Sequence, residues 1–136
     1  MVSCSTPLEE GIDAPTSQAR GLVNSAAQGF QESFRKHPGR GAVTKFSERL
    51  VAHNNGSNQV VVLNTASAPS HGEVAMAVYS RADGARDGDP FGHWTVRMCV
   101  TLVAEGSTDA QVTVEGLTCP EVQDPPFAEV DATVDY

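Results

Sequence analysis

Hydrophobic positions between residues 13 and 41 recur with the period of an α-helix. An apolar residue returns every fourth position and two more widen the stripe: Leu22, Val23, Ala26, Ala27, Phe30 and Phe34. Asp13 or Thr16 suits the N-cap and Pro15 suits the first turn. The basic run at 35–37 and the sequence HPGRG suit a helix C-terminus. This pattern predicts one long amphipathic helix.

Residues 43–53 fit two periodicities. Val43, Phe46 and Leu50 have helical spacing, whereas Phe46, Leu50 and Ala52 also share one face of a strand. The sequence HNNGSNQ that follows has the composition of a hairpin turn. We therefore favour a strand at 43–53, with a short helix as the alternative.

Three later runs have the character of β-strands. Residues 60–63 are apolar on both faces, which predicts an internal strand. Apolar residues alternate at 74–78, and again at 94–102 before the turn sequence EGSTD and the returning segment 111–119. The tail 120–136 is acidic and contains two consecutive prolines, so we expect either an edge strand within 128–134 or disorder.

The order of these elements predicts an α+β fold. One long N-terminal helix packs on a curved antiparallel sheet of four to five strands, within a single domain at 15–119. Residues 1–14 are expected to form a flexible tether. The order resembles that of cystatin-like and nuclear-transport-factor-like folds, which host enzymes, inhibitors, sensors and adaptors alike, so the likeness does not define a function.

Two of the three cysteines lie in the last predicted hairpin, where the alternation of side chains between the two faces of a strand indicates the direction in which each cysteine points. Cys99 and Cys119 are both out of phase with the apolar residues of their strands, so they project from the same face, away from Trp94. A cross-strand disulfide is therefore expected, with two free thiols as the alternative. Disulfides are typical of exported proteins.

The remaining cysteine, Cys4, ends the sequence MVSC. This sequence resembles the end of a bacterial lipoprotein signal, in which small residues precede the cysteine that receives the lipid. Val2 and Ser3 match these positions, whereas Met1 replaces the expected leucine and the upstream signal peptide is missing. The resemblance implies that Cys4 is the lipid-anchor cysteine of an exported, envelope-associated protein. An incidental cysteine in a frayed terminus is the alternative.

Charge excludes one class of function. The 136-residue chain has a formal net charge of −8 and no run of apolar residues long enough to span a membrane. An acidic surface opposes the phosphates of nucleic acids and anionic lipids. We therefore expect no nucleic-acid binding, and membrane contact only through a lipid on Cys4.

Motifs for catalysis or metal binding are absent from the sequence. The four histidines adjoin turns and lack metal-ligand spacing: His37, His53, His71 and His93. Asp83, Asp87 and Asp89 lack the spacing of a calcium loop, and there is no nucleophile elbow or phosphate-binding loop. We expect no cofactor and no metal.

One pocket remains conceivable between the helix and the sheet. Its apolar lining would be Phe30, Phe34, Met76, Trp94 and Met98. The alternative is that these side chains simply fill the core.

Three functions are consistent with these features. The first is a non-catalytic exported domain, lipid-anchored or secreted, that binds a partner protein or envelope component through the loop 81–92 or the acidic tail. The second is a small-molecule-binding or enzymatic pocket domain of the same fold. The third is an extracytoplasmic sensor domain of a membrane receptor, which would dimerise through its long helix.

Overall fold

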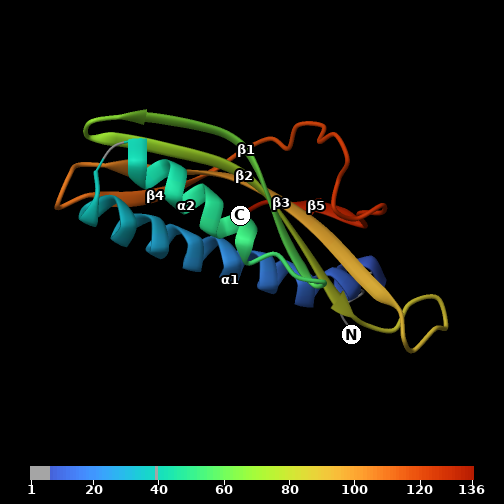
Figure 1. The fold of residues 1–136 in the computed structure, drawn as a ribbon. Coiled ribbons are helices and arrows are strands. Elements are labelled where there is room, and N and C mark those ends of the chain that lie inside the picture. The colour runs from blue at the N-terminus through green and yellow to red at the C-terminus, as the bar shows by residue number, and fades with distance from the viewer. Residues whose placement is uncertain (1–6, 39) are drawn as a thin grey trace.

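The computed structural model describes residues 7–38 and 40–136, and it has the predicted α+β architecture (Figure 1). Its elements in chain order are α1 (Pro7–Lys36), α2 (Arg40–Ala52), β1 (Asn58–Ala68), β2 (His71–Asp83), β3 (His93–Glu105), β4 (Gln111–Gly116) and β5 (Ala132–Val134). Both helices lie on one face of a strongly twisted sheet. Within the described residues, neither helix is long and apolar enough to cross a membrane.

The helix α1 begins earlier than the sequence indicated. We expected a tether through residue 14, but 7–14 form the first turns of α1, with Pro15 inside the helix. The early start is stabilised by packing on Trp94, because a Cβ added at Gly11 would lie 2.2 Å from Trp94 Cε2. Residues 1–6, with Cys4 and the rest of the predicted tether, lie outside the described residues.

The strand predicted at 43–53 is wrong, because these residues belong to α2. Val43 and Phe46 face the core from this helix, and the Phe46 ring stacks on Phe30 of α1 at a centroid distance of 4.8 Å. The helical spacing of residues 43–53 was therefore the correct interpretation, and HNNGSNQ connects a helix to a strand.

The sheet has the order β1-β2-β3-β4, and its neighbouring strands are antiparallel. The short β5 runs parallel to β3 at Val96–Met98, beyond the end of the β4 pairing. The predicted edge strand within the tail therefore forms, at Ala132–Val134. The expectation that residues 60–63 are internal is wrong, because β1 is an edge strand. Its apolar character on both faces has another cause, namely that both faces of the sheet are covered.

The main core lies between the helices and the inner face of the sheet. It contains the α1 stripe, the apolar face of α2 and the inward residues of the strands. Phe30 and Phe34 of α1 meet edge to face at 5.9 Å, and both are fully buried. Gly72 of β2 lets Phe34 approach the sheet, since an added Cβ would lie 2.7 Å from its ring.

A smaller core lies on the outer face of the sheet. After β4 the chain crosses this face as residues 117–131, which we call the arch, and returns to β3 as β5 (Figure 1). Both ends of the arch bind the β3 backbone, because Leu117 N–H donates to Cys99 O at 3.0 Å and Asp131 N–H donates to Thr95 O at 2.8 Å. Phe127 of the arch is buried in this second cluster with Tyr79.

Candidate binding cleft

A half-open cleft of about 280 Å³ lies where α1, α2 and the start of β1 meet. Its lining is mostly apolar and consists of Leu22, Ser25, Ala26, Gly29, Phe46, Arg49, Leu50, His53, Asn54, Asn58 and Val60. A concave apolar surface with a few polar groups is the usual form of a binding site.

Small side chains on α1 open this cleft. Ser25 and Gly29 lie one helical turn apart on the cleft wall. The nearest side-chain atom to a Cβ added at Gly29 would be Phe46 Cε1 at 3.8 Å, which is an ordinary contact distance. A glycine in a helix interior costs about 1 kcal/mol relative to alanine. Because no close packing requires Gly29, its effect here is to leave space beside α2.

The polar groups of the cleft carry no negative charge. Arg49 comes from the last turn of α2, and His53 and Asn54 follow the end of this helix. Asn54 is held in place, because its Oδ1 accepts from Val60 N–H at 2.7 Å and its Nδ2 donates to Val60 O at 3.2 Å. Among the residues that the structure describes, no carboxylate lines the cleft, although the chain has a formal charge of −8. The site is therefore suited to an apolar group with a neutral or anionic polar end.

The residues predicted to line a pocket between the helix and the sheet fill that space themselves. Phe30, Phe34, Met76 and Met98 are fully buried in the main core. Trp94 is also buried, and its Nε1–H donates to Ala85 O at 3.2 Å. These five residues are therefore core residues, as the alternative interpretation of the sequence held.

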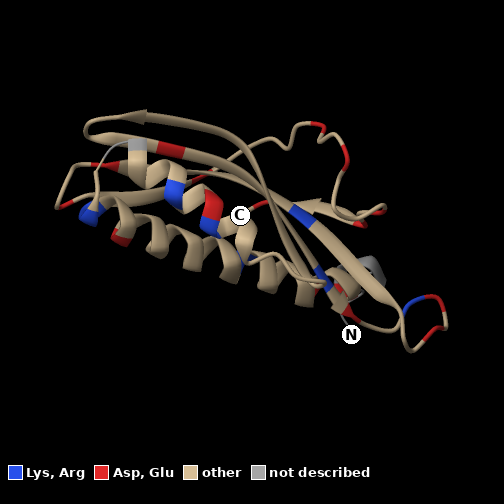
Figure 2. Cartoon of the chain, in the orientation of Figure 1, with Lys and Arg blue, Asp and Glu red and all other residues tan. Residues whose placement is uncertain are grey.

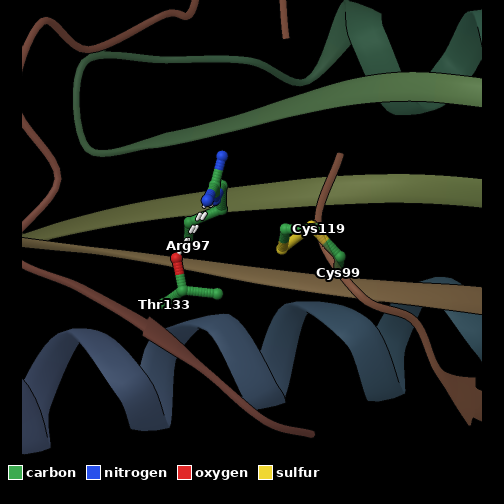
Figure 3. The surroundings of a disulfide bond; sticks show 4 residues. All are labelled: Arg97, Cys99, Cys119 and Thr133. Atoms are coloured by element: carbon green, nitrogen blue, oxygen red, sulfur yellow. Dashed lines mark hydrogen bonds between the residues drawn. A yellow bond between two sulfur atoms is a disulfide. The ribbon is translucent and has the colours of Figure 1, made fainter. Parts of the chain in front are cut away.

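The two cysteines of the last hairpin are bonded to each other. Cys99 on β3 and Cys119 on the arch form a disulfide, with their Cα atoms 5.3 Å apart (Figure 3). Leu117, rather than Cys119, lies opposite Cys99 in the register of β3 and β4, and Cys119 reaches Cys99 from two residues further along the chain. The bond joins the start of the arch to the outer face of the sheet. Cys4 lies outside the described residues.

The histidines and the acidic loop do not converge on a metal site. His93 Nδ1 lies 2.8 Å from Asp83 Oδ1, and the ring nitrogens of His71 lie 3.5 and 3.6 Å from two glutamates. Asp89 Oδ1 accepts from Phe91 N–H at 2.9 Å within the turn between β2 and β3. Over residues 7–38 and 40–136, no group of three or more potential metal ligands gathers.

The two surfaces proposed from sequence for recognition, the 81–92 loop and the tail, meet at one end of the sheet. Arg86 of the loop forms an ion pair with Asp131, which also accepts from Thr95 N–H at 2.9 Å. The hydrogen bond to the Asp131 carboxylate, together with its charge, raises the pKa of the Arg86 guanidinium. Figure 2 shows acidic residues along both segments. This ion pair fastens the loop to the arch and neutralises part of the acidic surface.

The cleft was missed by sequence reasoning because it depends on α2. The helical spacing of Phe46 and Leu50, combined with the small residues of α1, was the available signal.

Comparisons of the chain with protein-family models, curated proteins and solved structures gave no match.

Proposed function

We propose that this protein is a non-catalytic exported domain of the bacterial cell envelope, lipid-anchored or secreted, that binds a partner protein or envelope component. The observation that carries the proposal is the half-open apolar cleft between α1, α2 and β1, whose polar groups are neutral or basic. An apolar side chain of a partner would occupy it, with an acidic or neutral group beside Arg49 and His53.

Export is supported by two independent features. The first is the Cys99–Cys119 disulfide, since such bonds persist in oxidising compartments. The second is the resemblance of MVSC to the end of a lipoprotein signal, which makes Cys4 the anchor cysteine. On this basis the domain acts outside the cytoplasm, tethered to the membrane by a lipid or released.

A second candidate function is the binding of a small molecule in the same cleft. Its volume of about 280 Å³ is close to the lower end of the range for such sites, about 300–1,000 Å³. The sensor alternative has weaker support, because the apolar stripe of α1 that would mediate dimerisation is buried against the sheet and α2.

The cleft can be tested with two matched glycine substitutions on α1. Gly29→Leu fills the cleft, whereas Gly21→Leu makes the same chemical change at an exposed site with no atom within 4 Å of an added Cβ. Both changes favour the helix by about 1 kcal/mol, so both variants should fold. We expect the wild type and Gly21→Leu to bind the apolar anionic dye anilinonaphthalene sulfonate equally, and Gly29→Leu to bind at least about tenfold more weakly.

Equal dye binding by the two variants would contradict the assignment of the cleft. If the cleft is confirmed, displacement of the dye by cell-envelope extract separates the two candidates. A displacing activity that proteases destroy supports a partner protein. A displacing activity that resists proteases and passes a dialysis membrane supports a small molecule.

Export is tested separately by counting thiols. Alkylation of unreduced, denatured protein should modify Cys4 alone, which intact mass and peptide mapping would show. Modification of all three cysteines in protein purified under oxidising conditions would remove the case for export.

A further inference from the structure

A second cavity, of about 380 Å³, lies between the arch and the outer face of the sheet. Its polar floor includes Tyr79 of β2, Arg97 of β3 and Thr133 of β5. These residues form one row across three strands, because Tyr79 pairs with Arg97 and Arg97 pairs with Thr133. The cavity is separate from the cleft at the helices, and the two share no lining residue.

Arg97 is fixed in orientation within this cavity. Its Nε and Nη2 donate to Thr133 Oγ1 at 3.2 and 3.1 Å (Figure 3). Among residues 7–38 and 40–136, Arg97 takes part in no ion pair with a carboxylate. A guanidinium held by a neutral hydroxyl keeps its positive charge available, and its planar donors match a carboxylate.

Tyr79 adds an unused hydrogen-bonding group beside this arginine. The residue is 1% exposed, and its hydroxyl has no hydrogen-bond partner among the described residues. Leaving a buried hydroxyl unpaired is unfavourable, so native structures usually provide a partner. The hydroxyl is buried, and the ring centroid of Phe127, on the arch, lies 6.4 Å from that of Tyr79.

The arch supplies the apolar walls and one carboxylate. Phe127 and Val130 line the cavity from its apolar side, and Glu121 lines it as an exposed residue. The apolar walls favour a ligand with a compact hydrocarbon body. The Glu121 carboxylate disfavours a second negative charge on the ligand.

We propose that the cavity under the arch binds an organic monocarboxylate with a compact apolar body. The carboxylate accepts hydrogen bonds from the Arg97 guanidinium and the Tyr79 hydroxyl, and the apolar body lies against Phe127 and Val130. Because the Tyr79 hydroxyl is buried and arch residues line the same cavity, binding includes a small outward shift of residues 120–130. This site is additional to the cleft and does not depend on the proposed function.

The probe for this site is phenylacetate, with phenylacetamide as its uncharged isostere. Titration of ¹⁵N-labelled protein should give saturable shifts of backbone amides at Tyr79, Arg97 and Phe127 with phenylacetate. Arg97→Gln should weaken binding at least about tenfold, as expected for the loss of a charge-assisted hydrogen bond. Lys45→Gln, which removes a positive charge from the exposed face of α2, should leave it unchanged.

Tyr79→Phe is the second variant, since it retains the buried ring. It should fold normally and bind phenylacetate several-fold more weakly, which keeps the proposal testable if Arg97→Gln does not fold. The proposal would be overturned by the absence of saturable shifts, by equal binding of phenylacetamide, or by unchanged affinity in both folded variants. None of these outcomes bears on the dye-binding test of the cleft.

Discussion

At the scale of single residues, three asparagines protect the free edge of β1. Asn54 pairs with both backbone groups of Val60, as a neighbouring strand would. Asn55 Oδ1 accepts from Asn58 N–H at 2.9 Å, and Asn64 Oδ1 accepts from Thr65 N–H at 2.9 Å. Unpaired strand edges favour association with other chains, so such caps are useful on an edge without charged residues.

Asn54→Ala should destabilise the fold by about 1–3 kcal/mol, because it leaves the partly buried N–H and C=O of Val60 without partners. Urea denaturation measures this change. Asn64→Ala is the matched control, since it removes one exposed hydrogen bond and should change stability by no more than about 0.5 kcal/mol. A change in stability for Asn54→Ala as small as that expected for Asn64→Ala would show that the Asn54 cap contributes nothing measurable.

At the scale of elements, sequence patterns worked where one periodicity dominated. The α1 stripe and the alternation of β2 and β3 were predictable, because one face of each packs on the main core. The pattern failed for 43–53, where thirteen residues of α2 carry an apolar face too short to distinguish a helix from a strand. It also failed for β1, whose outer face is apolar because the arch covers it.

The candidate sites were less predictable than the elements that build them. The cleft requires the contact between α1 and α2, and the second cavity requires the arch to cross the sheet. Both arrangements join residues far apart in sequence, so local periodicity contains no signal for them. Arg97 was visible only as a strand residue. The cysteine parity did indicate that Cys99 and Cys119 could meet, because Cys119 lies only three residues beyond the end of β4, next to β3.

The approach of α1 to the sheet gives a prediction at the same scale. Gly72→Ala should destabilise the protein by about 1–3 kcal/mol, because its Cβ would lie 2.7 Å from the Phe34 ring and 3.0 Å from Val43. Phe34 is fully buried and has little room to move. Gly116→Ala, at the end of β4 with no atom within 4 Å, is the control. Thermal unfolding that ranks the two variants equally would contradict this role of Gly72.

At the scale of the whole molecule, the sheet separates two hydrophobic clusters of unequal size. The main cluster joins both helices to the inner face, whereas the outer one depends on the arch and contains Tyr79, Cys99 and Phe127 among its buried residues. The arch has little regular structure of its own and is fastened by the disulfide at one end and by Asp131 and β5 at the other. The two clusters are therefore expected to respond differently when one fastening is removed.

Replacing both cysteines of the bridge by alanine should destabilise the protein by about 3 kcal/mol, since the bond closes a loop between residues 20 apart. The loss of protection from hydrogen exchange should be confined to the outer cluster. Hydrogen exchange should accelerate in the arch and at Tyr79, while amides of α1 and of the inner positions of β2 retain their protection, because the main core does not contain the bridge. Cys4→Ser is the control and should alter neither the free energy of unfolding nor the pattern of hydrogen exchange. A uniform loss of protection across the sheet would mean instead that the two clusters unfold as one cooperative unit. The arch would then be an integral part of the core and not a segment that unfolds independently of it.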